Sequence, residues 1–230
     1  MPDFSDEAEV THEAKRRLRV ELLARRRALP AARRAEAAAS VRAALVDLVR
    51  RLRPARMTAY VPVGSEPGGP ELPEALRAAL PPDAELLLPV LREDLDLDLD
   101  WAAYPGPGCL VAAGRGLREP AGPRLGCSAV ADAQLVVVPA LAVDRGGRRL
   151  GRGGGSYDRA LARVGGTALT VALLHDGELL KHLPAEPHDR PVRAVVAPAT
   201  GLRTLAAGPV SAPALPLDEP GSDDAPLALE

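Results

Sequence analysis

Amphipathic segments and short apolar runs alternate along most of the chain. Three segments predict helices, and Pro30 and Pro54 mark where the first two end: residues 6–29, 31–52 and 71–80. Five largely apolar runs predict strands: residues 56–63, 85–91, 135–138, 167–174 and 193–197.

Several of these runs are apolar throughout, which is typical of strands covered on both faces of a sheet. Because strands alternate with helices, the sheet is expected to be mostly parallel. We therefore expect an α/β fold, a three-layer Rossmann-like arrangement in which helices flank a mostly parallel central sheet.

Three other segments complete the predicted organisation. Residues 95–101 (LDLDLDW) alternate strictly and predict a half-exposed strand with solvated aspartates, because the glycine and terminal glutamate of a calcium loop are absent. Residues 105–128 contain many Gly and Pro and are expected to form loops. Residues 1–200 are predicted to form one domain, and residues 201–230, rich in Pro, Ala and acids, a flexible tail.

Composition narrows the classes of function. A net charge of −2 gives no reason to expect nucleic acid or an anionic membrane as a partner. No apolar run approaches the roughly 20 residues that span a bilayer, and the N-terminus lacks the order of a signal peptide, so a cytoplasmic protein is expected. Cys109 and Cys127 have no metal-ligand spacing and are predicted to be ordinary thiols.

Residues 134–159 combine a buried strand, a loop with six glycines and four arginines, and the start of a helix. Backbone N–H groups of such a loop can approach anionic oxygens, and a helix N-terminus adds partial positive charge. The loop lacks the lysine of a P-loop, and position 156 is Ser where a dinucleotide fingerprint has Gly or Ala. A phosphate loop of another class and a structural glycine loop therefore both remain open.

Charged residues favour the phosphate interpretation. Arg148, Arg149 and Arg152 concentrate cations where the loop offers N–H donors. Asp158 would repel a phosphate directly, but it suits a site in which Mg²⁺ lies between carboxylate and phosphate.

The sequence RLGRGGGSYDR at residues 149–159 resembles the G-x-R-L-G-x-G-x-G-Y-Y-D signature of 5-formyltetrahydrofolate cyclo-ligases, also called methenyltetrahydrofolate synthetases. Other matches follow in order over about residues 12–200. They are Lys15 and Arg19 (K-x-x-x-R), Tyr60 to Glu66 (Y-x-P-x-x-x-E), Leu88-Pro89, Glu119-Pro120, residues 137–144 (VVPALAVD) and Glu186 to Asp189 (E-x-H-D).

The resemblance implies an enzyme that uses ATP and Mg²⁺ to convert 5-formyltetrahydrofolate into 5,10-methenyltetrahydrofolate, ADP and phosphate. It implies Lys15, Arg149 and Tyr157 as catalytic residues and Asp158 and Asp189 as metal ligands. The residues implied for ATP are Lys15, Arg19, Arg149, Gly151, Arg152, Gly153, Gly154, Gly155, Ser156, Tyr157 and Asp158.

For the folate, the resemblance implies contacts by Glu66 and Tyr157. Tyr60 and Trp101 are expected as apolar walls, since a flat heteroaromatic ligand favours aromatic contact. The expected protein is a monomer whose partner is this small molecule, with no nucleic acid and no membrane.

One position departs from the family pattern. Ser156 stands where the family usually has the first of two tyrosines. If that tyrosine only packs at the helix start, Ser156 can cap the helix instead; if it contacts the substrate, affinity or substrate identity differs. Two alternatives stay open: a folate- or nucleotide-binding paralogue without this activity, and an α/β phosphotransferase acting on another acceptor. His188 is interpreted as structural rather than as an acid/base group.

Overall fold

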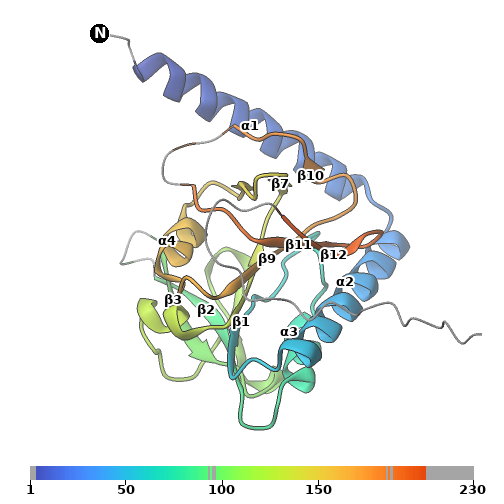
Figure 1. Cartoon of the computed structure of the whole chain (residues 1–230), viewed down its shortest axis with the longest axis vertical. Helices are drawn as coiled ribbons and strands as arrows, with labels where there is room; N and C mark the ends of the chain where they lie inside the picture. The colour runs from blue at the N-terminus through green and yellow to red at the C-terminus, as the bar shows by residue number, and fades with distance from the viewer. Residues whose placement is uncertain (1–3, 93, 95–96, 185, 187–188, 206–230) are drawn as a thin grey trace, which may run out of the picture.

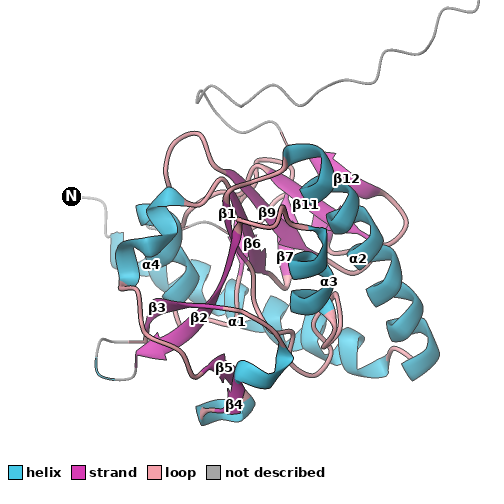
Figure 2. Cartoon of the chain, turned by 90° about the horizontal axis from the view of Figure 1, so that it is seen from below, coloured by secondary structure: helices cyan, strands magenta, loops and turns pink. Residues whose placement is uncertain are grey.

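The computed structural model describes residues 4–92, 94, 97–184, 186 and 189–205. Its centre is a seven-stranded sheet in the order β12-β11-β9-β6-β1-β2-β3, seen in Figures 1 and 2. These strands are β1 (Arg56–Thr58), β2 (Glu85–Arg92), β3 (Asp98–Ala103), β6 (Leu135–Pro139), β9 (Leu169–Leu173), β11 (Ala194–Ala197) and β12 (Gly201–Thr204).

The inner strands of the sheet run parallel, and the edge strands β3 and β12 pair antiparallel with their neighbours. The buried faces of β6 and β9 explain why their sequences are apolar throughout. The predicted mostly parallel α/β sheet is therefore confirmed.

Helices cover both faces of this sheet. On one face α2 (Ala31–Leu52) and α3 (Leu72–Ala79) pack over a core that includes Leu45, Leu48 and Leu76. On the other face lie α4 (Ser156–Arg163) and the 3₁₀ helix η4 (Cys127–Asp132). Figure 2 shows α2 and α3 together on one side of the strands and α4 on the other. The three-layer expectation is confirmed.

A small sheet and the N-terminal helix form a cap beside the main layers. The sheet contains β10 (Leu179–Leu180), β7 (Ala142–Asp144) and β8 (Arg149–Leu150), and α1 (Phe4–Ala28) packs on it through Leu22. Figure 1 shows α1 running past β7 and β10. This cap brings the start of the chain next to the glycine loop.

The region of residues 105–128 is less irregular than predicted. It contains a two-stranded antiparallel sheet of β4 (Leu110–Ala112) and β5 (Arg118–Pro120). Two short 3₁₀ turns, η2 (Pro107–Cys109) and η3 (Gly114–Gly116), precede and separate these strands. Such short strands have no period that a sequence could reveal.

Two expectations about strands are wrong. Asp98 and Asp100 in β3 are buried rather than solvated, because Arg163 pairs with Asp98 at 2.6 Å and Asp100 accepts hydrogen bonds from backbone N–H groups, including that of Gly126. The predicted strand at residues 56–63 is shorter: β1 ends at Thr58, ahead of Pro62, which has no N–H to donate.

The expected boundary at residue 200 also moves. Gly201, in a left-handed conformation, turns the chain after β11, and residues 201–204 add the edge strand β12 through backbone hydrogen bonds. Leu202 packs against the core, so this segment needs few bulky side chains to fold. The rest of the predicted tail, residues 206–230, lies outside the described residues.

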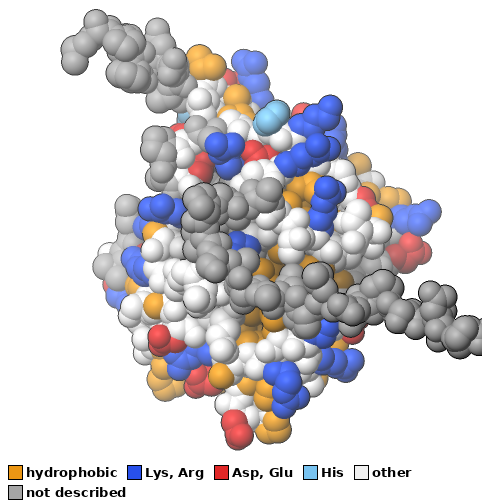
Figure 3. All heavy atoms as spheres, in the orientation of Figure 1, with side chains coloured by type: hydrophobic (Ala, Val, Ile, Leu, Met, Phe, Trp, Pro, Cys, Tyr) orange, Lys and Arg blue, Asp and Glu red, His pale blue; other side chains and the backbone are white. Residues whose placement is uncertain are grey.

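Two properties of the described residues bear on possible partners. No helix among them is both long and apolar enough to cross a membrane. On the face shown in Figure 3, cationic side chains occur among acidic and apolar ones.

Candidate active site

A cavity of about 590 Å³ opens at the carboxyl ends of the parallel strands. Tyr60 follows β1, Pro89 lies near the end of β2, and Pro139 ends β6, and all three line the cavity. After β1 the chain adds β2 on one side of β1, and the later strands β6 and β9 lie on its other side. The order in which the chain adds strands to the sheet therefore reverses at this point. Ligands of open α/β sheets bind at such a point.

The glycine loop forms one wall of the cavity. Gly147 within it has φ +85°, and a Cβ at this position would come 2.3 Å from the carbonyl oxygen of Val192. The buried carboxylate of Asp144 accepts hydrogen bonds from the N–H groups of Gly146 and Arg148. These contacts fix the loop so that its second half faces the cavity, which is lined by Gly151, Arg152, Gly153, Gly154, Gly155 and Ser156.

The loop leads into α4, whose N-cap residue is Gly155 with φ +68°. Of the two possibilities for Ser156, the structure does not show capping: Ser156 is the first residue of the helix, and no side chain forms a cap hydrogen bond. Its side chain lines the cavity instead. Ser156 therefore lies at the cavity wall, at the position where the family pattern usually has a tyrosine.

Arg149 is buried in the cavity wall, where it contacts three groups. Its guanidinium lies 3.0 Å from the carboxylate of Asp158, 3.3 Å from the carbonyl oxygen of Pro139 and 5.8 Å from the ring centroid of Tyr157. Its Nε has no hydrogen-bond partner within the described residues. The neighbouring Arg148 is half-exposed near Asp144 and does not line the cavity, so only part of the predicted arginine cluster reaches the site.

The helix α1 supplies two further cations. Lys15 is only 3% exposed, and its ammonium lies 2.5 Å from Glu186 and 2.7 Å from Asp189. Arg19, one turn later, donates a hydrogen bond to the carbonyl oxygen of Gly151 at 2.9 Å. The pairing of Lys15 and Arg19 on one helix face is confirmed, and both side chains line the cavity.

The two predicted metal ligands lie in the same part of the cavity. Asp189 contacts Lys15, and Asp158 accepts a hydrogen bond from the N–H of Arg190 at 3.5 Å. Among the described residues, no group of three or more His, Cys, Asp and Glu forms a complete metal cage. Asp158 and Asp189 would supply the one or two carboxylates that Mg²⁺ takes together with phosphate oxygens and water, provided that the metal replaces Arg149 and Lys15 at these oxygens. His188 lies outside the described residues.

Two of the predicted folate residues, Tyr60 and Glu66, also line the cavity. Tyr60 is 3% exposed, and its hydroxyl has no hydrogen-bond partner within the described part of the chain. Glu66 accepts a hydrogen bond from the N–H of Val63 and pairs with Arg152 at 3.0 Å. A buried hydroxyl without a partner costs free energy, so it marks a position where a ligand's polar group could bind.

Tyr157 lines the same cavity as Arg149 and Glu66, with its ring beside the Arg149 guanidinium. Burial, and after it the negative charge of Glu66, raise the pKa of both Tyr60 and Tyr157. Arg149 opposes this effect at Tyr157 but does not cancel it. Both phenols therefore keep their protons at neutral pH and can donate hydrogen bonds.

The prediction for Trp101 is wrong. This side chain is 1% exposed, packs in the core with Val130 and Leu161, and is not among the residues that line the cavity. The reason is its place in the sheet, since α4 and η4 cover the face of β3 that carries it. Leu99, two residues earlier on β3, reaches the cavity instead.

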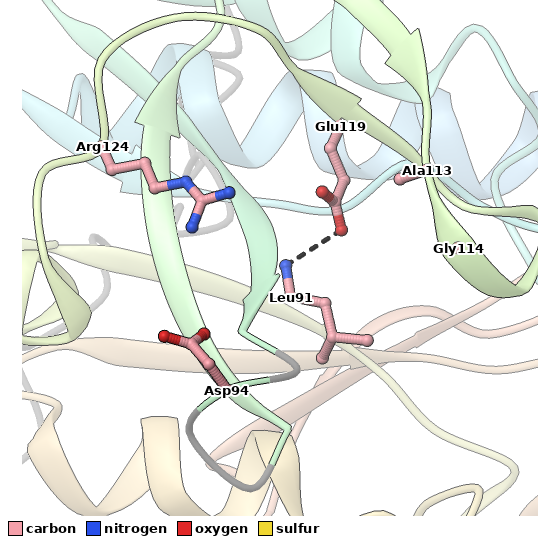
Figure 4. A pocket seen from close by; sticks show the side chains of 6 residues that line it. All are labelled: Leu91, Asp94, Ala113, Gly114, Glu119 and Arg124. Atoms are coloured by element: carbon pink, nitrogen blue, oxygen red, sulfur yellow. Dashed lines mark hydrogen bonds between the residues drawn. The ribbon is translucent and has the colours of Figure 1, made fainter.

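Several cavity residues were not assigned from the sequence. Glu119 accepts a hydrogen bond from the N–H of Leu91 at 2.9 Å, which ties β5 to the end of β2. Leu91 and Glu119 also line a second, smaller hollow of about 350 Å³ beside the cavity, shown in Figure 4 with Asp94 and Arg124. The Glu119-Pro120 motif was the available signal, but nothing in it indicated a role.

Comparisons with known proteins agree on one family. The model described as the 5-formyltetrahydrofolate cyclo-ligase family matches residues 11–198. A 5-formyltetrahydrofolate cyclo-ligase of Mycolicibacterium smegmatis is 45% identical over 195 residues, which cover 84% of this chain and 97% of that protein. The enzyme of the same name from Escherichia coli K12 is 42% identical over 65 residues, covering 28% of this chain and 36% of its own.

Solved structures give the same result for the fold. The NMR structure of Aquifex aeolicus 5,10-methenyltetrahydrofolate synthetase matches with a TM-score of 0.69 and 29% identity, covering 86% of this chain and 95% of that chain. A 5,10-methenyltetrahydrofolate synthetase from Mycoplasma pneumoniae matches with a TM-score of 0.61 at 16% identity, over 79% of this chain and 96% of its own, and supports the fold alone.

Proposed function

The chain belongs to the 5-formyltetrahydrofolate cyclo-ligase family, and on this premise we propose how its cavity performs the reaction. The protein is an enzyme of one-carbon folate metabolism, and enzymes of this family use ATP. The proposed reaction converts 5-formyltetrahydrofolate and ATP into 5,10-methenyltetrahydrofolate, ADP and phosphate.

One observation carries the proposal for the site. A single cavity is lined by the glycine loop, Lys15 and Arg149, and also by Tyr60 and Glu66. The first set suits phosphates, since backbone N–H groups and cations neutralise their charge. The second set suits a flat ligand with polar edges, because an aromatic side chain and hydrogen-bonding groups lie together.

The chemistry explains why phosphoryl transfer is needed. The formamide carbon of the substrate is a poor electrophile, and its oxygen is a poor leaving group. When the formyl oxygen attacks the γ-phosphorus of ATP, the bond to ADP breaks and the carbon becomes electrophilic. N10 then bonds to this carbon and loses its proton, and the former formyl oxygen departs with the phosphate.

Catalysis of phosphoryl transfer depends mainly on positioning and charge neutralisation. In the proposed arrangement, Lys15, Arg19 and Arg149 bind phosphate oxygens, and the N–H groups of the glycine loop add donors. Asp158 and Asp189 would hold Mg²⁺, which supplies further neutralisation of the phosphates. Arg149 keeps Asp158 in place at 3.0 Å, and Lys15 does the same for Asp189 at 2.7 Å.

On the folate side, Glu66 would accept hydrogen bonds from ring N–H groups, and Tyr157 would donate one near the reacting centre. Both tyrosines keep their protons because burial raises their pKa, so they act as neutral donors rather than as bases. We propose that the enzyme acts as a monomer with this small molecule as its partner.

The test is to incubate the purified protein with ATP, Mg²⁺ and 5-formyltetrahydrofolate and to follow the absorbance of methenyltetrahydrofolate. We expect product formation that requires all three additions. A folded protein that binds 5-formyltetrahydrofolate but forms no product would instead be a non-catalytic paralogue. Activity only with a different acceptor would indicate another phosphotransferase.

A further inference from the structure

One face of α1 carries three cations toward the cavity. Lys15, Arg19 and Arg26 are spaced by four and seven residues, so they lie on the same side of the helix and line the same cavity. Arg26 is 2% exposed and forms two hydrogen bonds of 2.7 Å with the buried carboxylate of Glu178. Its guanidinium also donates to the carbonyl oxygen of Ala140 at 2.6 Å.

Glu178 has a second attachment. Its Oε2, which accepts a hydrogen bond from Nη2 of Arg26, also accepts one of 2.7 Å from the backbone N–H of His175. His175 lies in the turn that follows β9. The N–H of Val143 in β7 donates to the backbone oxygen of Glu178 at 3.1 Å. The position of His175 is thereby fixed to both α1 and the small sheet.

The side chain of His175 reaches a distant loop. It is 6% exposed, and its Nε2 lies 2.9 Å from the carbonyl oxygen of Ser65. Because a carbonyl oxygen can only accept, Nε2 carries the hydrogen of this bond. Ser65 directly precedes Glu66, whose carboxylate faces the cavity. The bond therefore connects the turn after β9 to the residue directly before Glu66, the proposed folate contact.

We propose that His175 is a positioning residue that sets the loop of Glu66 against the cavity and so determines the affinity for 5-formyltetrahydrofolate. The Arg26–Glu178 pair holds His175 in place and at the same time fixes α1, which carries Lys15. One buried ion pair therefore fixes both the helix that carries the proposed phosphate-binding Lys15 and the histidine that holds the loop of Glu66. This inference rests on the proposed contact between Glu66 and the folate.

The experiment measures the dissociation constant of 5-formyltetrahydrofolate by calorimetry without ATP, in a double-mutant cycle of His175→Ala and Glu66→Gln. Loss of one hydrogen bond predicts that His175→Ala weakens binding about 5- to 10-fold in the wild-type background. If His175 acts through Glu66, the same change in the Glu66→Gln background weakens it less than about 2-fold.

Matched variants separate positioning from general destabilisation. His175→Gln keeps an N–H donor and is expected to bind within about 2-fold of wild type, whereas His175→Asn, whose side chain is too short, should behave like His175→Ala. His182→Ala replaces an exposed histidine and should change nothing. Should His175→Ala fail to fold, the Asn and Gln pair gives the same comparison.

Two results would overturn the inference while leaving the proposed folate contact intact. One is an unchanged dissociation constant in His175→Ala beside a weakened one in Glu66→Gln. The other is an equal weakening by His175→Ala in both backgrounds, which would show a general effect on the fold. If Glu66→Gln alone changes nothing, the proposed folate contact fails, and the positioning inference fails with it.

Discussion

Lys15 carries one positive charge between two carboxylates, at 2.5 Å from Glu186 and 2.7 Å from Asp189. In the same part of the cavity Arg149 lies 3.0 Å from Asp158. A phosphate entering this space meets cations that are already engaged with carboxylates. Each cation can bind the phosphate only if its carboxylate gains another positive partner, which suits the entry of ATP together with Mg²⁺.

Replacing Lys15 by Ala should reduce kcat/KM for ATP by about 100-fold or more, because it removes a preorganised cation from the phosphate side and leaves two carboxylates close together. Steady-state kinetics at saturating folate would measure this loss. Lys181→Ala, at an exposed lysine, is the matched control and should be neutral. Near-normal activity of Lys15→Ala would remove Lys15 from the mechanism.

Asp158→Asn tests the other proposed metal contact. We expect the Mg²⁺ concentration that gives half-maximal activity to rise about 10-fold or more, and turnover to fall, because an amide is a weaker ligand for a hard cation. A magnesium titration of activity is the measurement. The control is Asp132→Asn, which changes an exposed carboxylate that pairs with Arg56 outside the cavity. It should leave the titration unchanged.

Tyr157 provides a prediction about pH. Its pKa is raised by burial and by Glu66, so the phenol stays protonated as the pH rises through the ordinary tyrosine range. Tyr157→Phe should therefore raise KM for the folate about 5-fold, for loss of one hydrogen bond, by the same factor at every pH from 7 to about 9.5. A ratio that changes with pH across this range would mean that Tyr157 titrates during the reaction.

At the scale of elements, the glycine loop depends on backbone positions that only glycine occupies without strain. Gly147 has φ +85° and lies next to the carbonyl oxygen of Val192. The N–H of Val192 donates a hydrogen bond of 2.8 Å to the carbonyl oxygen of Gly147. This contact joins the loop to the segment before β11. The conformation of the loop therefore depends on its contacts with the surrounding sheet as well as on its own sequence.

Gly147→Ala should lower the free energy of unfolding by more than about 1 kcal/mol, because its Cβ would lie 2.3 Å from Val192 O and the residue would keep a left-handed φ. Denaturant unfolding would measure the change. Gly122→Ala is the control, since a Cβ there meets no atom within 4 Å. Equal stability of both variants would show that the loop relaxes freely.

The sequence allowed the main elements to be predicted where the pattern was long or apolar. The bounds of α2 and the buried strands β6 and β9 came directly from prolines and apolar runs. The burial of Asp98 could not be predicted, because its partner Arg163 is 65 residues away and only the tertiary fold brings the two together. β4 and β5 are too short to show a period.

The same distinction holds in the site. The glycine loop, Lys15 and Glu66 form recognisable local motifs, and the cavity brings them together. Trp101 was misplaced because the sequence does not reveal that α4 covers its face of β3. His175 was assigned no role, since its contact with Ser65 spans 110 residues and leaves no local pattern.

At the scale of the whole molecule, one buried ion pair attaches the N-terminal helix to the sheet. Arg26 and Glu178 are 2% and 5% exposed and share two hydrogen bonds. The apolar contacts of α1, centred on Leu22, lie beside this pair in the cluster with Leu141 and Leu150. The orientation of α1, and with it the place of Lys15, depends on both.

Arg26→Ala should lower the free energy of unfolding by about 3–5 kcal/mol, because it leaves the carboxylate of Glu178 buried without its cation. Thermal or denaturant unfolding would measure this loss. Arg16→Ala removes an arginine of the same helix that pairs with Glu13 in solvent, and it should change stability little. Similar stabilities of the two variants would mean that α1 is held by its apolar face alone.

The wide separation along the chain between α1 and its charged partners has a consequence for biosynthesis. Lys15 and Arg26 leave the ribosome early, yet Glu178, Glu186 and Asp189 are translated more than 150 residues later. At about 5–20 residues per second, Lys15 and Arg26 spend roughly ten to thirty seconds without these carboxylate partners. The charge pairs of the cavity therefore form only after Asp189 has been translated.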